Sequence, residues 1–124
     1  MFTPPLKCLL LVEDDALIRV AVAMLLEDEG FGVVAAPDAE SALRLMRDGL
    51  DAPVMVTDVD LGAGASGVEL ADELRRLRPG IGIIFVTGRA ASLAGRSLGP
   101  REAALSKPFQ GHALSKLVRQ MAAS

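Results

Sequence analysis

The sequence predicts a three-layer α/β/α sandwich built on a five-stranded parallel sheet. Short apolar segments, typical of buried strands, alternate along the chain with longer segments whose apolar residues recur at helical spacing. This alternation favours parallel pairing through right-handed crossovers, with helices on both faces of the sheet. The 124 residues are the length of one domain.

The expected strands are the five short apolar segments. They cover residues 8–12, 31–36, 54–58, 81–87 and 103–106. The third, Val54-Met55-Val56-Thr57-Asp58, runs directly into a carboxylate, and a glycine-rich loop follows it. A buried strand of a parallel sheet has this composition, and it would deliver Asp58 where the chain leaves the sheet.

The expected helices cover residues 16–29, 39–48, 68–77 and 109–121. Asp14 or Asp15 can cap the first of them, and Asp38 the second. Residues 88–101 contain three glycines, a proline and few apolar residues, so any helix there should be short or frayed.

Composition limits the classes of function. Hydrophobic residues make up 51% of the chain, but none of its apolar runs approaches the ~18 residues of a membrane span. The N-terminus lacks the pattern of a signal peptide, and a single cysteine excludes an internal disulfide, so we expect a cytoplasmic protein with no membrane contact.

Charge is distributed unevenly. Residues 1–74 hold 15 acidic and 4 basic residues, whereas residues 75–124 hold 1 acidic and 9 basic, which gives −11 against +8 and the net charge of −3. With no Tyr, no Trp and no clustered basic run, nucleic-acid binding is not expected. The basic half instead suggests a surface that contacts a protein partner.

Polar side chains follow four of the expected strands. In the flavodoxin-like strand order 2-1-3-4-5, a crevice opens between strands 1 and 3, and both strands end in carboxylates. The residues at the four strand ends are Asp14 and Asp15, Asp58, Thr87 and Lys107. All four ends open onto one edge of the sheet.

This set of side chains suits phosphoryl transfer. Crowded carboxylates repel one another, and Mg²⁺, which prefers oxygen ligands and keeps several waters, relieves the repulsion while leaving positions for a phosphoryl group. Asp58 would be the nucleophile, Lys107 a cation for Asp58 or a phosphoryl oxygen, and Thr87 a nearby hydroxyl. The product would be an aspartyl phosphate.

Four motifs resemble those of bacterial response-regulator receiver domains, in order and spacing, over about residues 7–122. They are Leu11-Val12-Glu13-Asp14-Asp15, Thr57-Asp58, Val86-Thr87-Gly88 and Ser106-Lys107-Pro108-Phe109. The resemblance implies one receiver domain over residues 1–124, of the single-domain type without an output domain. It also implies a cis bond between Lys107 and Pro108.

The resemblance also implies roles for the site residues. Asp58 would be the phosphoacceptor, Asp14 and Asp15 the acidic pair that holds Mg²⁺, and the backbone carbonyl of Asp60 a further metal ligand. Thr87 would be the switch hydroxyl and Lys107 the lysine that completes the site.

The resemblance further implies partners. The phosphoryl donor would be the phosphohistidine of a sensor histidine kinase or a histidine phosphotransfer protein. The domain would catalyse only its own phosphorylation and dephosphorylation. Phosphorylation would switch the binding of a downstream protein target, which we expect at the face formed by residues 88–119, and a homodimer is possible.

Three features depart from the family pattern. Ala104 stands three residues before the lysine, where an aromatic residue is usual. Residues 61–64 lack the usual proline and carry two glycines instead. Residues 88–101, where a fourth helix belongs, are poor in helix formers.

Two alternatives remain open from the sequence. Asp58-Val59-Asp60 resembles the nucleophile motif of haloacid-dehalogenase-like phosphatases, although that family places it on the first strand. A pseudo-receiver would keep the fold as a protein-interaction module without phosphorylation, but it would be expected to lack one of the acidic pair, the threonine or the lysine.

Overall fold

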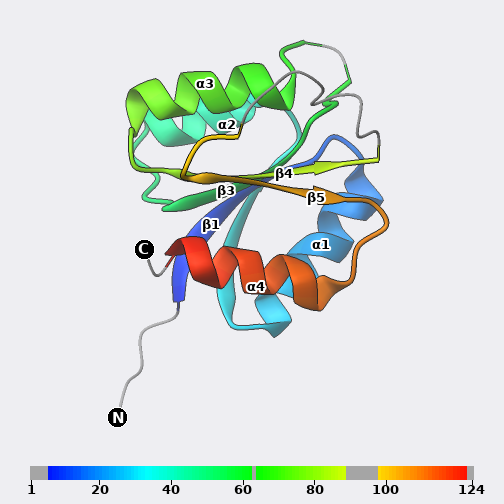
Figure 1. The fold of residues 1–124 in the computed structure, drawn as a ribbon. Helices are drawn as coiled ribbons and strands as arrows, with labels where there is room; N and C mark the ends of the chain where they lie inside the picture. Colours follow the sequence, from blue (N-terminus) through cyan, green and yellow to red (C-terminus); the bar gives the residue numbers. More distant parts are fainter. Residues whose placement is uncertain (1–5, 63, 89–97, 123–124) are drawn as a thin grey trace.

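Five parallel strands form the centre of the molecule in the order β2-β1-β3-β4-β5 (Figure 1). The computed structural model describes residues 6–62, 64–88 and 98–122. The strands are β1 (Leu6–Val12), β2 (Phe31–Ala36), β3 (Val54–Asp58), β4 (Gly82–Thr87) and β5 (Glu102–Ser106). The predicted fold class and strand order are confirmed.

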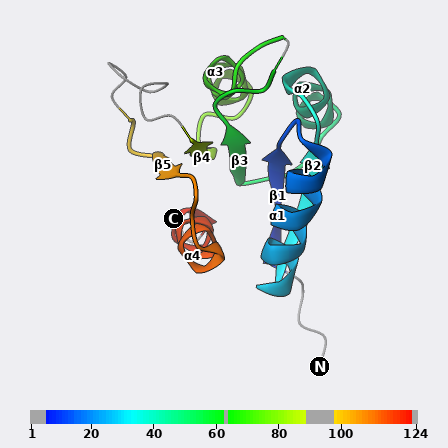
Figure 2. The ribbon, with the colours of Figure 1, turned by 90° about the vertical axis from the view of Figure 1, so that its right-hand side faces the viewer.

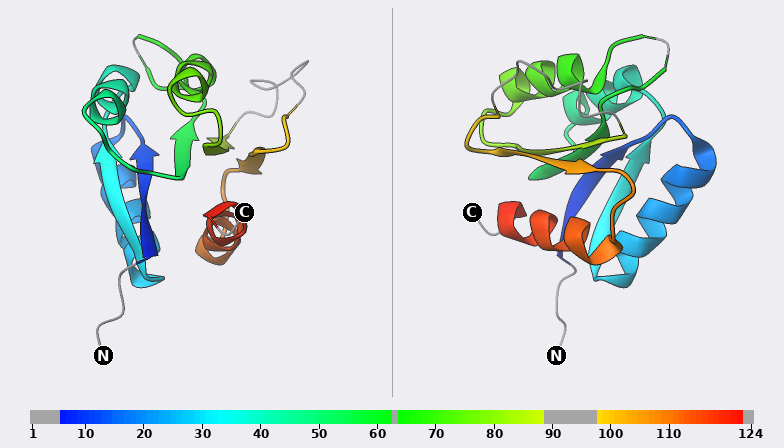
Figure 3. Two further views of the ribbon diagram at one scale, coloured as in Figure 1. Left: turned by 90° about the vertical axis from the view of Figure 1, so that its left-hand side faces the viewer. Right: turned by 45° about the vertical axis from the view of Figure 1, so that its right-hand side comes forward.

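Four described helices cover the two faces of this sheet. They are α1 (Ala16–Asp28), α2 (Ala39–Arg47), α3 (Gly67–Leu77) and α4 (Gly111–Ala122). The views in Figures 2 and 3 place α2 and α3 together on one face and α1 and α4 on the other. The sandwich therefore has the three layers that the sequence predicts. Within the described ranges, no helix is long and apolar enough to cross a membrane.

Alternating strand residues supply two separate cores. One set faces α2 and α3, and it includes Leu10, Val12, Met55, Ile83 and Phe85. Their neighbours along the strands face α1 and α4. Because both faces are covered, the central strands are apolar on both sides, which explains why they appear in the sequence as continuous hydrophobic runs.

The starts of α1, α2 and α3 are fixed by side-chain caps. Asp15 caps α1 by accepting from the amides of Leu17 and Ile18, and Asp38 caps α2 by accepting from the amide of Ser41. A reciprocal pair of hydrogen bonds between Ser66 and Glu69 caps α3. Such caps satisfy amides that have no partner within the helix.

The last helix begins two residues later than the sequence predicts. The bond between Lys107 and Pro108 is cis, as the resemblance implies, and the chain enters α4 only at Gly111. The backbone carbonyl of Gln110 accepts the first hydrogen bonds of the helix, from the amides of Ala113 and Leu114. Most of the segment expected to form a frayed helix, residues 89–97, lies outside the described residues.

Candidate functional site

Asp58 and Lys107 meet at the edge of the sheet where the parallel strands end. Asp58 is the last residue of β3, and Lys107 directly follows β5. The Nζ of Lys107 lies 2.7 Å from Oδ2 of Asp58, across 49 residues of sequence. The Asp58 side chain is only 12% exposed, so this ion pair is largely shielded from bulk water.

Thr87 lies between these two residues in the sheet, at the end of β4. Thr87 is buried, and its backbone carbonyl accepts a hydrogen bond from the amide of Lys107 at 2.8 Å. The ladder from β3 through β4 to β5 therefore fixes the backbone on which Asp58, Thr87 and Lys107 stand. The structure brings these three predicted residues to one edge.

Three carboxylates gather beside the lysine. Glu13, Asp14 and Asp58 each offer an oxygen, and these oxygens all lie within 4.8 Å of one another. Glu13 is buried, Asp58 half-buried and Asp14 exposed, so the group reaches from the interior to the surface. Oxygen donors in this arrangement suit Mg²⁺, which keeps part of its water shell.

Asp15 lies outside this group of carboxylates. Its Oδ1 accepts the amide of Leu17 at 2.9 Å and that of Ile18 at 3.1 Å, so the carboxylate is used as the cap of α1. Sequence reasoning paired Asp14 with Asp15 and did not single out Glu13. The sequence does contain a signal for this assignment. The acid directly before the helix, Asp15, is the natural cap, so Glu13 and Asp14 are the two acids that remain for the site at the sheet edge.

Burial and carboxylate crowding shift the ionisation of Glu13. Burial, followed by the hydrogen bond to Asp58 and its negative charge, raises the pKa of Glu13 to about 7. Burial alone would lower the pKa of Lys107, but the hydrogen bond to Asp58 and the nearby carboxylates raise it, so the lysine stays charged. In the metal-free protein, therefore, the Glu13 carboxyl group takes up its proton as pH falls through about 7, well above the usual range for a glutamate.

The loop after β3 is folded against the site. Val59 and Leu61 are buried in the core on the α2 and α3 side, whereas Asp60 between them is exposed. The amide of Gly67 closes the loop by donating to the carbonyl of Val59 at 2.8 Å. A Cβ at Gly67 would overlap the backbone carbonyl of Asp58, so only glycine allows α3 to begin this close to the end of β3.

Ala104 is the position where the family usually has an aromatic residue. It pairs with Phe85 of β4 in the sheet register and is exposed. A methyl group at this exposed site cannot alternate between a buried and an exposed position as a large ring can. The structure therefore offers no aromatic rotamer at residue 104 that could follow the state of Thr87.

Replacing Glu13 with glutamine is expected to stabilise the metal-free protein at pH 8. The pKa of Glu13 is raised on folding, so its contribution to stability is present at acid pH and is lost as pH rises through about 7. The variant lacks this loss. Its free energy of unfolding should therefore exceed that of the wild type by on the order of 1–3 kcal/mol at pH 8, and by less at pH 5.5. Urea unfolding in the presence of a chelator measures both values.

Asp15→Asn is the matched control for this experiment, since asparagine also caps helices well. It should leave the difference between pH 5.5 and pH 8 unchanged. Added Mg²⁺ should then stabilise wild type and Asp15→Asn more than Glu13→Gln. Equal magnesium effects in Glu13→Gln and wild type would show that Glu13 is not part of the metal site.

Comparison with known proteins identifies relatives over nearly the whole chain. Residues 9–119 match the family model of the response regulator receiver domain. The chain is 34% identical over 116 residues to the sensor kinase CckA of Brucella abortus, covering 90% of this chain and 12% of the kinase. It is 36% identical over 114 residues to the transcriptional regulatory protein CseB of Streptomyces coelicolor, covering 89% of this chain and 47% of that protein.

Solved structures agree with these matches. A response regulator receiver protein from Sinorhizobium medicae superposes with a TM-score of 0.87 at 26% identity, covering 95% of each chain. The response regulator TrrA of Thermotoga maritima, solved in complex with Mg²⁺ and BeF, superposes with a TM-score of 0.83 at 26% identity, covering 93% of this chain and 98% of that one. The chain thus spans about half of CseB and a small part of CckA.

Proposed function

This chain belongs to the family of response regulator receiver domains, and we propose that it accepts a phosphoryl group on Asp58 in a magnesium-dependent reaction. Receiver domains are phosphoacceptor signalling modules of two-component systems, and they interact with histidine kinases and phosphotransfer proteins. A phosphatase of the haloacid-dehalogenase type and a pseudo-receiver are not favoured.

The observation that carries the proposal is the 2.7 Å pair between Lys107 and Asp58 within a group of carboxylates. Lys107 orients the Asp58 carboxylate and supplies a fixed positive charge where phosphoryl oxygens would lie. The low exposure of Asp58 limits competing contact with water. Bound Mg²⁺ would supply a Lewis acid for the phosphoryl oxygens.

We assign the metal to Glu13, Asp14 and Asp58, with Asp15 kept as the helix cap. The backbone carbonyl of Asp60 is a proposed further ligand, since the loop turns back across the same edge. Thr87, at the end of β4, is proposed to place its hydroxyl toward the phosphoryl group. Chemistry by the chain itself would be restricted to gaining and losing this one group.

Incubation with Mg²⁺ and acetyl phosphate tests the function. Mass spectrometry should show the gain of one phosphoryl group, and peptide mapping should place it on Asp58. A chelator should prevent the gain. A gain that maps elsewhere, or that persists without a divalent cation, would contradict the proposal.

An exposed apolar stripe on α1 points to where a protein donor docks. Four of the six large apolar side chains that are exposed in the described ranges lie on this helix. Leu17, Val20 and Met24 follow one another at helical spacing, and Leu17 is 83% exposed. The helix starts beside the acidic group, so its exposed face adjoins the route to Asp58.

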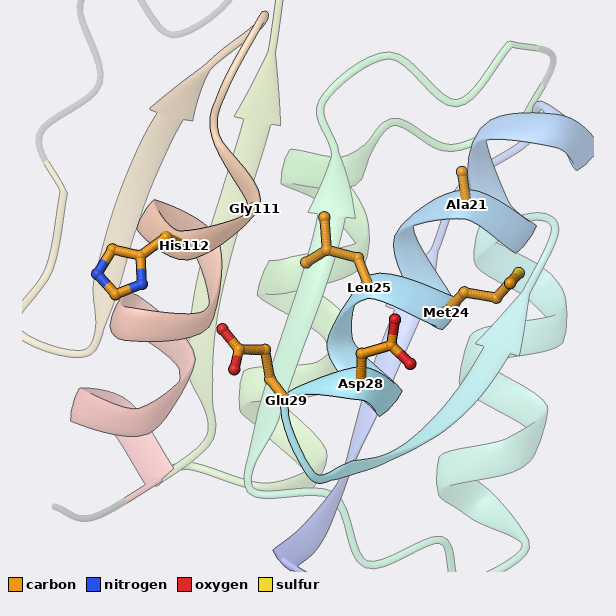
Figure 4. Close-up of a pocket in the computed structure, with 7 residues that line it drawn as sticks. All are labelled: Ala21, Met24, Leu25, Asp28, Glu29, Gly111 and His112. Atoms are coloured by element: carbon orange, nitrogen blue, oxygen red, sulfur yellow. The ribbon is translucent and has the colours of Figure 1, made fainter.

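A groove between α1 and α4 continues this stripe. Figure 4 shows Leu25 of α1 facing the start of α4, with Asp28 and Glu29 at the lower end, His112 across the gap and Met24 on the side of α1 away from α4. The groove has a volume of about 570 Å³. It can receive apolar side chains of a partner, while Asp28 at its lower end can pair with a basic one; Glu29 is already paired with Arg119.

Charge decides which occupant fits this surface. Exposed Glu27 and Asp28 end the helix, where negative charge is unfavourable, and Asp14 and Asp15 lie at its start. A second copy of α1, packed either parallel or antiparallel, would bring acidic ends together. We therefore propose that the occupant is a helix of the histidine-containing phosphodonor with an apolar stripe flanked by Lys or Arg.

Replacing both Val20 and Met24 with glutamine is expected to slow phosphorylation by a protein donor at least about tenfold at subsaturating donor, because apolar contact area is lost. Phosphorylation by acetyl phosphate, which needs no docking, should be unchanged. The donor is a phosphotransfer protein or kinase that phosphorylates the wild type. Leu77→Gln, an exposed apolar position on α3, is the control and should affect neither rate.

We propose separately that the downstream protein target binds the face formed by residues 88–119. Residues 89–97, which include Arg96, lie outside the described residues. Of the other arginines, Arg101 donates to the carbonyls of Gly80 and Met121, and Arg119 pairs with Glu29. Much of the basic charge that the sequence places on this face is thus already used within the molecule.

A further inference from the structure

The loop after β3 brings its main chain directly against a metal-site carboxylate. A Cβ built on Gly62 would lie 3.0 Å from Oδ2 of Asp14, closer than ordinary van der Waals contact. The φ of Gly62 is +72°, in the left-handed region that side chains rarely adopt. Residue 62 is therefore constrained both in its conformation and in the space beside it.

We infer that Gly62 is a positioning residue of the acidic site, whose missing side chain gives the Asp14 carboxylate the room to lie beside Glu13 and Asp58. The functional consequence rests on the proposed magnesium site. The effect of residue 62 on the position of the Asp14 carboxylate follows from the geometry alone.

If a side chain at residue 62 met the Asp14 carboxylate, the carboxylate would move away, because the loop is anchored by its neighbouring residues. Leu61, the preceding residue, is 3% exposed in the core. The loop is closed by the bond between the Gly67 amide and the Val59 carbonyl, and the Val59 amide donates to Val86 of β4. The Asp14 carboxylate is at the exposed end of a side chain that can rotate, so it moves more easily than a backbone that is anchored on both sides of residue 62 by Leu61 and Gly67.

The same geometry excludes a proline at residue 62. Proline fixes φ near −65°, which is incompatible with the +72° observed at Gly62. A chain that takes this path over the acidic site therefore favours glycine at residue 62.

Gly64 provides a matched control within the same loop. Its φ is +96°, so an alanine there would meet the same kind of backbone strain, but a Cβ on Gly64 would have no atom of the described residues within 4 Å apart from its own chain neighbours. Gly62→Ala and Gly64→Ala thus share the conformational cost. They differ in the contact with Asp14.

Magnesium titration of the wild type and both variants by calorimetry is the first arm of the test. Gly62→Ala should weaken Mg²⁺ binding about tenfold, the effect typical of disturbing the support of a metal ligand, and Gly64→Ala should leave it near the wild-type value. Equal affinities in the two variants would overturn the inference, whether both were weakened or neither was.

A metal-free arm separates this inference from the proposed function. The ¹³Cγ resonance of Asp14, recorded with a chelator present, should move in Gly62→Ala and remain in place in Gly64→Ala. An unmoved resonance in Gly62→Ala would overturn the inference. If the wild type bound no Mg²⁺, the proposed metal site would fail, whereas this resonance would still decide the role of Gly62.

Discussion

Asp58→Asn is expected to eliminate the phosphoryl adduct formed with acetyl phosphate and Mg²⁺. The amide keeps the shape of the side chain but is not a nucleophile, and no second carboxylate in the described site has its 2.7 Å contact with Lys107. Intact-mass spectrometry over a time course measures the loss. The expected result is no adduct at any time when the wild type is fully modified.

Asp60→Asn is the matched control, because this acid lies two residues later and is exposed. It should still acquire one phosphoryl group, since only its backbone carbonyl is proposed to act at the metal. A remaining adduct in Asp58→Asn, or its loss in Asp60→Asn alone, would assign the nucleophile to a different carboxylate.

Lys107→Met is expected to reduce the rate of phosphorylation by about 10²- to 10³-fold, the usual cost of removing one oriented donor from a developing negative charge. Methionine keeps most of the length and volume of lysine but lacks its charge. Magnesium binding should not weaken, because the change removes a cation from a site that attracts one.

A slower phosphorylation rate together with an unweakened magnesium affinity would be specific to the loss of the Lys107 charge. Rates with acetyl phosphate and magnesium affinities by calorimetry are measured on the same preparations, with Lys116→Met as the control at an exposed lysine of α4. A general disturbance of the fold would weaken both properties together. Parallel losses in Lys107→Met would therefore argue against a role in transfer.

The fold was predictable because the central strands β1, β3 and β4 are buried on both faces. Continuous runs such as Leu9 to Val12 and Ile83 to Val86 supply both cores at once, so their apolar character marks them without ambiguity. Helix starts at Asp15, Asp38 and Ser66 follow from local hydrogen bonding. These features depend on neighbouring residues, which a sequence displays directly.

The details of the site were less predictable because they depend on a choice between adjacent residues. Three acids in a row, Glu13, Asp14 and Asp15, follow β1, and one of them is taken by the helix cap. The sequence also shows the glycines of the next loop, but the closeness of Gly62 to Asp14 arises only when the loop folds back. Contacts of this kind join separate segments.

The start of α1 links the two surfaces that a signalling partner and a metal ion would use. Asp15 holds the first turn of the helix, and Arg19 of that turn donates to the carbonyl of Glu13 at 2.9 Å. These hydrogen bonds tie the backbone that carries the carboxylates to the helix that carries the apolar stripe. A partner that binds more tightly when Mg²⁺ is present must, by thermodynamic reciprocity, tighten Mg²⁺ by the same factor. Docking of the donor and binding of Mg²⁺ would then be thermodynamically coupled, each strengthening the other.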